Sequence, residues 1–237
     1  MKTEHTLRDN LYVMGDNHGK LLVLSNALAG SRIKEGSDVI LLGDNGLIMD
    51  DITTDYIWNN DYAEINKLAK EKDVRIFLLR GNHDNPASYK HELSYSNVIL
   101  LEDLDTATWR DKKAIFIPGA VSIDRCLRKM RGWNWYENEG LPELDLLSLG
   151  RHDIVFSHGG PLPRKLRKDR AIVDHYCCLD QDLADDLAKE QITWQLILAA
   201  VSPKTMYYGH YHVTDSFRIY RVNCKPRGID RLDLVKI

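Results

Sequence analysis

One stretch of the chain decides the fold, because it runs from a buried strand directly into three polar residues: Val74-Arg75-Ile76-Phe77-Leu78-Leu79-Arg80-Gly81-Asn82-His83-Asp84. The apolar run ends at Leu79, and Gly81 then allows the backbone to change direction. An amide, an imidazole and a carboxylate follow in direct succession. Since Asn, Asp and Gly are common in turns, this stretch on its own is typical of a polar turn after a strand. The other segments of the chain test that interpretation.

The same order, an apolar run followed by Gly or Ser and then by polar residues, recurs along the chain. Short apolar runs typical of buried strands occupy residues 11–14, 39–42, 153–156 and 205–208. Helical spacing follows the first two runs, over 21–30 and around 57–69. Strands that are too apolar to have a solvated face, alternating with helices, indicate a parallel sheet that is covered by helices.

The middle and the end of the chain are expected to add antiparallel elements. Residues 106–110 and 114–117 flank Asp111-Lys112-Lys113 as the strands of a hairpin would. The spacing predicts a helix over 141–149, closed by Gly150, and another over 179–200. Further strands are expected over 98–101, 217–222 and 232–235.

Composition indicates one soluble globular domain over residues 1–237. The chain contains no linker, repeat or low-complexity tract, and its net charge of -3 gives no global attraction to nucleic acid or membranes. The N-terminus lacks the apolar core of a signal peptide, and no apolar run is long enough to span a bilayer. None of the four cysteines forms a Cys-x-x-Cys pair, so we expect reduced thiols in a cytoplasmic protein. The sequence does not indicate an oligomeric state.

The residues that follow the five apolar strands are of the types that bind divalent metal ions. They are Asp16 and His18, Asp44, Asn82 and His83, His158, and His210 and His212. Because functional groups gather at the carboxyl ends of strands in open α/β sheets, these loops are expected to form one site. Oxygen ligands from Asp and Asn, combined with imidazoles, suit manganese, iron and zinc. Each motif alone is more common in a turn, but the five together predict a metal site.

This series of motifs resembles the calcineurin-like metallophosphoesterase superfamily. All five blocks of its signature are present and in order: Gly15-Asp16-Asn17-His18-Gly19, Gly43-Asp44, Gly81-Asn82-His83-Asp84, Ser157-His158 and Gly209-His210-Tyr211-His212. The resemblance extends from Asp16 to His212. It implies an α/β fold, a four-layer α/β/β/α sandwich of two packed mixed sheets, with two metal ions at one edge.

The resemblance also implies a role for each of these residues. It assigns one metal ion to Asp16, His18 and His212, the other to Asn82, His158 and His210, and a bridge between both to Asp44. The two ions are expected to be manganese, with iron or zinc as alternatives, and a hydroxide between them would attack phosphorus in line. His83 is expected to be the general acid or to stabilise the leaving group. Asp84 is expected either to orient His83 or to cap the loop.

The chain departs from the protein Ser/Thr phosphatase branch of the superfamily. In that branch an Asp and then an Arg follow the Gly-Asp block three residues on, whereas Leu47 and Ile48 occupy those positions here. The Asp–His relay and the phosphate-binding Arg of that branch are therefore missing, unless Asp50 or Asp51 reaches the site. This departure argues against a dedicated protein phosphatase.

A second segment resembles small stand-alone phosphoesterases of bacteria and phages. It consists of Gly119-Ala120-Val121-Ser122-Ile123-Asp124-Arg125 together with the downstream Trp133 and Trp135. Two basic loops, 125–131 and 164–170, either attract an anionic substrate or form ordinary solvated faces. Arg125 and Arg128 are the expected phosphate contacts. The two tryptophans either stack on a base or pack beneath the loop.

The sequence thus predicts a binuclear metal-dependent phosphoesterase, most simply a phosphomonoesterase acting on a phosphoprotein or a small phosphate ester. The alternative is a phosphodiesterase or nucleotide pyrophosphohydrolase acting on cyclic nucleotides, dinucleoside polyphosphates or nucleic acid, although the net charge does not indicate nucleic acid. A non-catalytic scaffold of the same fold is the remaining alternative, and it would be expected to have lost ligands. All seven predicted ligands and His83 are present.

Overall fold

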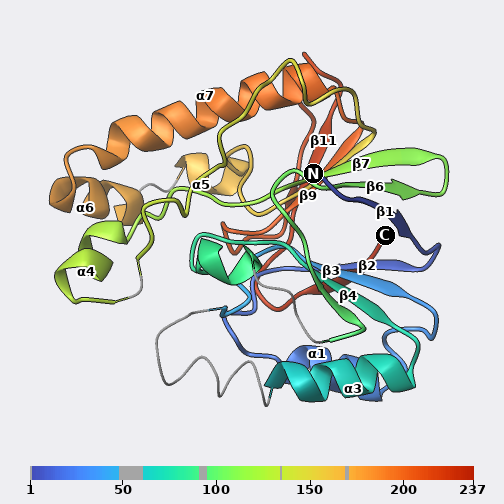
Figure 1. Ribbon diagram of the computed structural model, residues 1–237. Coiled ribbons are helices and arrows are strands. Elements are labelled where there is room, and N and C mark those ends of the chain that lie inside the picture. The colour runs from blue at the N-terminus through green and yellow to red at the C-terminus, as the bar shows by residue number, and fades with distance from the viewer. Residues whose placement is uncertain (1, 48–60, 91–94, 134, 169–170) are drawn as a thin grey trace.

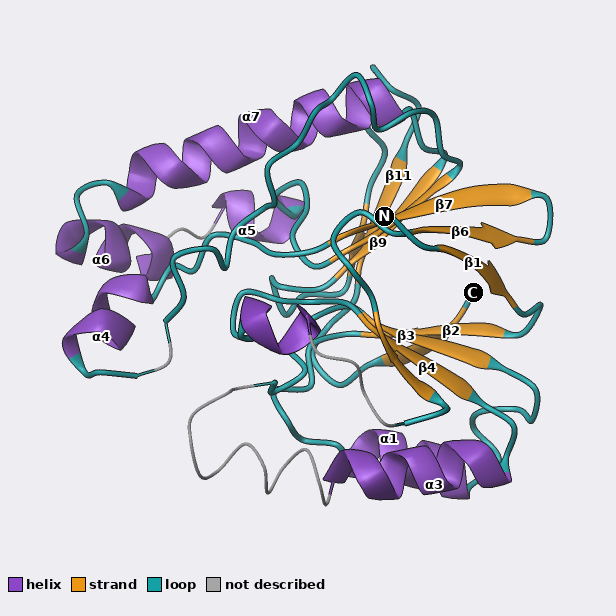
Figure 2. Cartoon of the chain, viewed as in Figure 1, coloured by secondary structure: helices purple, strands orange, loops and turns teal. Residues whose placement is uncertain are grey.

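The computed structural model describes residues 2–47, 61–90, 95–133, 135–168 and 171–237. Two mixed β-sheets lie face to face at its centre, and helices cover their outer faces (Figures 1 and 2). The helices α1 (Leu22–Ala29) and α3 (Ala63–Glu71) lie against one sheet, and α7 (Leu183–Val201) crosses the outer face of the other. The four-layer α/β/β/α architecture is therefore confirmed.

Both sheets contain a parallel centre with antiparallel additions. The larger has the spatial order β1 (Glu4–Leu7), β6 (Thr106–Trp109), β7 (Lys112–Ile117), β8 (Ile154–Ser157), β9 (Thr205–Tyr208), β11 (Lys225–Gly228) and β10 (Asp215–Ser216). The smaller has the order β12 (Leu234–Lys236), β2 (Leu11–Met14), β3 (Asp38–Leu41), β4 (Arg75–Leu78) and β5 (Val98–Leu100). Strands β2 to β5 are parallel, as are β7, β8 and β9, so the ends of each set lie at one edge.

Successive side chains of a strand point to opposite faces of its sheet, and at the centre of each sheet both faces are buried, which explains why the central strands are apolar throughout. On β4, Phe77 points into the core between the two sheets, whereas Ile76 and Leu78 point into the core beneath α1 and α3. On the larger sheet, Phe156 faces the inner core and Val155 packs with Trp194 of α7. Central strands such as β4 and β8 are thus buried on both faces, as the sequence predicted, although a second sheet replaces helices on one of them.

Two predicted elements are wrong. Residues 141–149 form irregular backbone and turns instead of a helix, and the Asp145 carboxylate accepts a hydrogen bond of 3.1 Å from the backbone N–H of Leu147, a local turn that competes with helical hydrogen bonding. Residues 217–222 do not form a strand, and only an isolated bridge joins Ile219 to Cys224.

The structure adds elements that the sequence did not predict. They are β1, β10, β11, and the short helices α4 (Arg125–Met130), α5 (Arg164–Lys168) and α6 (Ala171–Leu179), besides the 3-10 turn Pro86–Lys90. The predicted hairpin is present as β6 and β7, and the predicted last strand as β12. The start of the helix expected around 57–69 falls outside the described residues. Within the described part of the chain, no helix combines the length and the apolar composition that a bilayer crossing requires.

Candidate metal centre

The seven predicted ligands come together where β2, β3, β4, β8 and β9 end. A hydrogen bond of 2.8 Å from Nδ1 of His158 to the carbonyl oxygen of Leu42 joins the two sheets at this edge. Asp16, Asp44, Asn82 and His158 are buried at the base of the site. His18 and His212 form its outer side, with side chains that are 25% and 40% exposed.

One donor set surrounds the carboxylate of Asp16. Donor atoms of Asp16, His18, Asp44 and His212 all lie within 4.8 Å of one another, as a metal ion would require. Nε2 of His212 is 3.0 Å from Oδ2 of Asp16 and 3.2 Å from Nε2 of His18. Nε2 of His18 is also 3.7 Å from Oδ2 of Asp44. Two carboxylates and two imidazoles are a donor set that manganese, iron and zinc accept.

A second donor set converges on the amide oxygen of Asn82. This Oδ1 is 2.7 Å from Nε2 of His158 and 3.0 Å from Nδ1 of His210. Nε2 of His158 is 3.4 Å from Oδ1 of Asp44. Asp44 therefore directs one oxygen toward each set. Asn82, His158, His210 and Asp44 thus form a second group of potential ligand atoms, which shares Asp44 with the first group.

The hydrogen bond to Leu42 determines which nitrogen of His158 is free. Burial lowers the pKa of His158, so that its ring is neutral and carries a single proton. That proton lies on Nδ1, which donates to the carbonyl of Leu42. Nε2 thus presents a lone pair toward Asn82 Oδ1, which is itself an acceptor. Two lone-pair atoms that face each other at this distance fit a cation, which would relieve their repulsion.

The glycines that precede the ligands are required by close packing around two carboxylates. A Cβ added to Gly81 would overlap Oδ1 and the backbone N of Asp44, and one added to Gly209 would overlap Oδ1 of Asp16. Four of the ligands also have left-handed backbone conformations: His18, Asp44, His210 and His212. Left-handed conformations are uncommon for non-glycine residues and cluster at functional sites. The strand–Gly–ligand pattern therefore has a geometric cause.

The electrostatics of the site favour the metal-binding protonation states of Asp16, His18 and His210, whereas burial raises the pKa of Asp44 and the hydrogen bond with Asp16 raises the pKa of His212. Burial opposes ionisation of Asp16, but its electrostatic interactions and hydrogen bonds with the surrounding histidines outweigh this effect and lower the pKa of Asp16 to about 2. Burial lowers the pKa of His18 to about 4 and the pKa of His210 to about 3. Asp16 is consequently a carboxylate at neutral pH, and both histidines are neutral imidazoles.

His83 lies beside the donor sets. Its backbone N–H donates a hydrogen bond of 2.8 Å to Oδ1 of Asp44. Its half-buried ring lies edge-on to the ring of His18, with 5.3 Å between the centroids. This position leaves the imidazole next to the site and accessible from solvent.

The carboxylate of Asp84 accepts hydrogen bonds from its own loop and from Leu47. It accepts hydrogen bonds from the backbone N–H of Gly81 at 2.9 Å, from that of Leu47 at 3.1 Å, and from the Tyr89 hydroxyl at 3.2 Å. Both oxygens of Asp84 are used in this way and the residue is fully buried. Of the two roles expected for Asp84, this geometry is that of a loop cap.

The two arginines expected to contact phosphate have partners within the protein. Nε of Arg125 is 2.7 Å from Asp180, and its Nη1 is 2.7 Å from Asp186. Arg128 is 3% exposed and pairs with Glu139 at 3.1 Å. Among the described residues, Arg128 is linked to the donor sets through Ser122, to which it donates at 2.8 Å.

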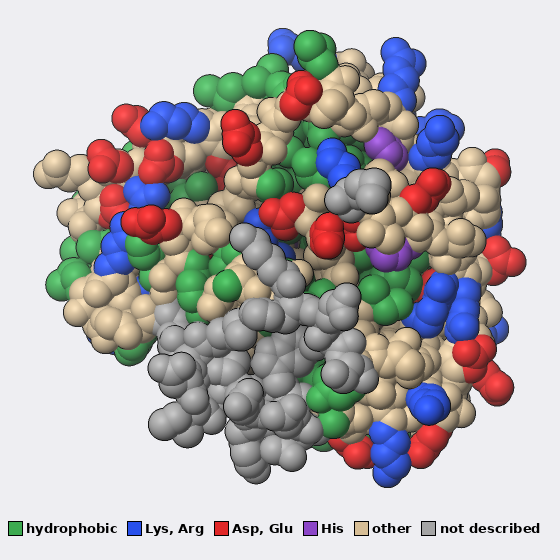
Figure 3. Space-filling view, viewed as in Figure 1, with side chains coloured by type: hydrophobic (Ala, Val, Ile, Leu, Met, Phe, Trp, Pro, Cys, Tyr) green, Lys and Arg blue, Asp and Glu red, His purple; other side chains and the backbone are tan. Residues whose placement is uncertain are grey.

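The basic loops are likewise engaged with neighbouring groups where the structure describes them. The Lys129 ammonium lies 3.7 Å from the ring centroid of Trp135, and the Arg131 guanidinium 4.7 Å from that of Trp133. Arg164 donates to the carbonyl oxygen of Ser216 at 2.8 Å. Acidic and basic side chains are interspersed on the face shown in Figure 3. Asp50, Asp51 and residues 169–170 lie outside the described residues.

Several buried polar residues around the ligands were not identified from the sequence. Ser122 accepts a hydrogen bond of 2.7 Å from Nδ2 of Asn82, and Glu139 binds both Ser122 and Arg128. Nδ2 of Asn45 donates to the Leu79 carbonyl after β4. Ser122 lies in the segment that resembles small phosphoesterases, but its type and spacing alone did not indicate a contact with a ligand.

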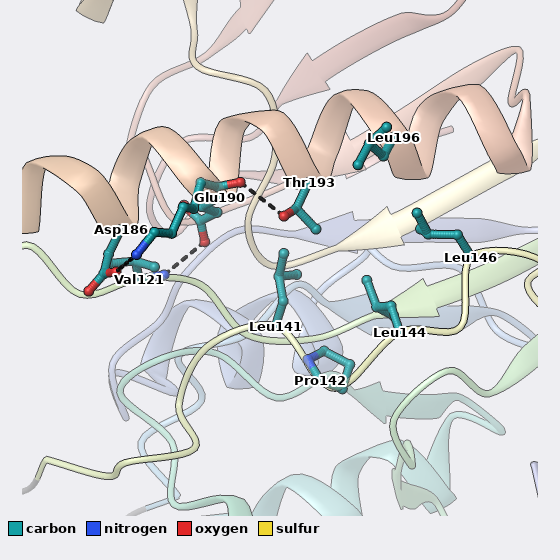
Figure 4. Close-up of a pocket in the computed structure, with 10 residues that line it drawn as sticks. Val121, Leu141, Pro142, Leu144, Leu146, Asp186, Glu190, Thr193 and Leu196 are labelled. Carbon is teal, nitrogen blue, oxygen red and sulfur yellow. Dashed lines mark hydrogen bonds and ion pairs between the residues drawn. The ribbon is translucent and has the colours of Figure 1, made fainter.

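A separate cavity of about 480 Å³ lies between α7 and the segment 141–146 (Figure 4). It is lined by Val121, Leu141, Pro142, Leu144, Leu146, Asp186, Lys189, Glu190, Thr193 and Leu196. Oε1 of the buried Glu190 accepts a hydrogen bond of 2.8 Å from the backbone N–H of Val121, and Oε2 has no partner among the described residues. Burial raises the pKa of Glu190 to about 8, so this carboxyl group is largely protonated at neutral pH.

Comparison with known proteins identifies the family. The model of the calcineurin-like phosphoesterases matches residues 10–232, so the chain belongs to this family and is a phosphoester hydrolase. Members of the family depend on two metal ions, which agrees with the cluster at the sheet edge. No curated protein sequence matches the chain.

Solved structures resemble the chain at low sequence identity. One crystal structure superposes with a TM-score of 0.54 at 12% identity, over 96% of this chain and 95% of the other. The phosphopantetheinyl hydrolase PptH from Mycobacterium tuberculosis superposes with a TM-score of 0.48 at 13% identity, also over 96% and 95% of the two chains. The first of these likenesses supports the four-layer fold.

Proposed function

We propose that the chain is a binuclear metal-dependent phosphomonoesterase acting on a phosphoprotein or a small phosphate ester. The observation that carries this proposal is the position of Asp44, whose two oxygens face two different donor sets. A carboxylate shared in this way suits a pair of cations that clamp one phosphoryl group. His83 beside the pair supplies a proton donor for the leaving group.

Each side chain has one task in this proposal. Asp16, His18 and His212 hold the outer metal ion, Asn82, His158 and His210 hold the inner one, and Asp44 binds both. When bound, the two ions supply Lewis acidity and an activated water. The donor sets combine carboxylate and amide oxygens with imidazoles, for which we propose manganese, with iron or zinc as alternatives. His83 protonates or stabilises the departing oxygen, a role typically worth about 10²–10⁴-fold in rate.

The exposure of the ligands indicates the side from which a phosphate ester approaches, and we propose the monoester because it makes the smaller demand on the site. His158 is fully buried, whereas His18 and His212 are partly exposed, so the substrate approaches from the outer metal ion. A monoester needs only this open side, because three of its phosphate oxygens are free and one group leaves. A diester needs a groove for its second substituent.

Activity against matched substrates tests the proposal. An aryl phosphate monoester and the corresponding aryl diester would be compared with manganese, zinc, iron and magnesium, after removal of bound metal by a chelator. We expect metal-dependent hydrolysis with the monoester preferred. A preference for the diester would overturn the monoester assignment in favour of the phosphodiesterase alternative. Protein that binds metal but hydrolyses neither ester at any pH would support a scaffold.

A further inference from the structure

The side chain of Asn82 has to be held in one orientation to bind a metal ion. A carboxamide binds a metal ion only through its oxygen, and a rotation of the side chain by half a turn would present the NH₂ group instead. Oδ1 of Asn82 points toward His158 and His210, at 2.7 and 3.0 Å. Nδ2 donates to Oγ of Ser122 at 2.7 Å on the opposite side. The partner of Nδ2 therefore determines which end of the amide faces the site.

A serine hydroxyl alone would not determine which end of the Asn82 amide faces it, because a hydroxyl group both donates and accepts hydrogen bonds. Arg128 removes part of this ambiguity, since a guanidinium can only donate and its Nη1 donates to Ser122 Oγ at 2.8 Å. The oxygen of Ser122 thus accepts from Arg128 on one side and from Asn82 on the other. This pattern favours the NH₂ end of the amide toward Ser122 and the oxygen toward the site.

Glu139 fixes the other two members of the network. Its Oε2 lies 3.1 Å from Nη1 of Arg128, and its Oε1 accepts from the backbone N–H of Ser122 at 3.2 Å. Asn82, Ser122, Arg128 and Glu139 are all at most 5% exposed. A buried guanidinium is costly unless it is paired, and Glu139 supplies the compensating charge. Low exposure also keeps water from competing for these hydrogen bonds.

A second buried arginine ties the network to the loop after β4, which carries Asn82. Nη1 of Arg80 donates to the backbone carbonyl of Glu139 at 3.0 Å. The carbonyl of Arg80 accepts from the backbone N–H of Gly119 at 3.0 Å. The segments 80–82, 119–122 and 138–140 are thereby held together around the amide of Asn82.

We propose that Ser122, Arg128 and Glu139 are positioning residues that hold the Asn82 amide with its oxygen toward the inner metal ion. This inference rests on the proposed function, in which Asn82 is a ligand. It gives Arg128 a role different from phosphate binding. It also gives a role to the segment from Gly119 to Glu139, which the ligand motifs do not include.

Stepwise metal binding tests this role without relying on turnover. Titration of the metal-free protein with Mn²⁺, followed by calorimetry and by electron paramagnetic resonance, resolves the two binding steps. For Ser122→Ala we expect one step to weaken about 10–100-fold, as is typical when the partner of a ligand is removed, and the other to change by less than about threefold. Ser122→Thr retains the hydroxyl and should restore the weakened step. Ser148→Ala, which removes an exposed hydroxyl, serves as the matched control.

A second pair of variants keeps the inference testable if the Ser122→Ala variant fails to fold. Glu139→Gln and Arg128→Met leave Ser122 in place but remove the charge or the obligatory donor, and we expect the same step to weaken. Unchanged binding of both ions in the folded Ser122→Ala, Glu139→Gln and Arg128→Met variants would overturn the inference. Equal weakening of both steps in parallel with lost thermal stability would also overturn it, because that is the result of a purely structural role. A wild-type protein that binds no divalent ion would instead overturn the proposed function, and the inference with it.

Discussion

The backbone N–H of His83 donates a hydrogen bond of 2.8 Å to Oδ1 of Asp44, the carboxylate that faces both donor sets. The main chain after β4 is therefore fixed to the centre of the site, and the position of the His83 ring follows from it. The hydrogen bond uses no atom of the imidazole. Replacement of the side chain consequently leaves this anchor and the ligands in place.

We expect His83→Ala to retain both metal ions and to lose about 10²–10⁴-fold in kcat. If His83 protonates the departing oxygen, the loss should be larger for an alkyl phosphate, whose leaving group is a strong base, than for a nitrophenyl phosphate. Metal content measured by mass spectrometry and kcat for the two substrates check both statements. His175→Ala, at an exposed position on α6, is the control. Loss of metal from the His83 variant would refute its assignment as a non-ligand.

Asp84→Asn should destabilise the protein instead of acting on His83. The carboxylate accepts from Gly81, Leu47 and Tyr89, and an amide would turn an NH₂ group toward at least one of these donors. A buried donor left without an acceptor costs about 1–3 kcal/mol in unfolding free energy. Urea denaturation of the metal-free variant measures this cost, with the exposed Asp185→Asn as the control. Unchanged stability together with a large loss of kcat would show that Asp84 orients His83.

Glu190 should make the protein less stable as the pH rises. Burial raises its pKa to about 8 in the folded state, whereas an unfolded glutamate titrates near about 4.3. Between these two values the folded protein holds a proton that the unfolded chain has released, so the unfolding free energy falls as pH increases through this window. The loss by pH 8 is on the order of a few kcal/mol.

The variant Glu190→Gln removes this titration and retains an acceptor for the N–H of Val121. We expect it to be more stable than the wild type at pH 8 and nearly equal to it at pH 5, as measured by urea unfolding at both values. Glu143→Gln, at an exposed position, should leave the pH dependence unchanged. An identical pH profile for the wild type and Glu190→Gln would show that Glu190 ionises normally.

The sequence predicted the strands at the site well because each of them is short, apolar and followed by a Gly or Ser. Phe77 and Ile76 illustrate why: they enter different cores, so neither position tolerates a polar residue. The prediction of a helix failed where a local hydrogen bond competes with the helical spacing of apolar residues. The segment 141–149 has helical spacing, but the turn at Asp145 competes with the helix, and Leu141 and Leu144 pack against the larger sheet without it.

The candidate ligands were predictable because each motif itself contains the Asp, Asn or His side chain that enters the site. Their surroundings were not, because contacts such as Asn82 with Ser122 join residues that are 40 positions apart in the sequence. Arg128 shows the consequence. Its charge suggested a phosphate contact, whereas the structure buries it against Glu139, and no feature of the sequence reports that pairing.

The central claim is that Asp44 serves two metal ions, and the metal stoichiometry of Asp44→Asn tests it most directly. The wild type and the variant would be stripped of metal, titrated with Mn²⁺ and compared by calorimetry, with unfolding measured in parallel. We predict two ions bound per wild-type chain and weakened binding of both in Asp44→Asn, because the asparagine retains at most one ligand oxygen and no charge. Loss of a single ion, with the other bound as tightly as in the wild type, would contradict the shared role of Asp44.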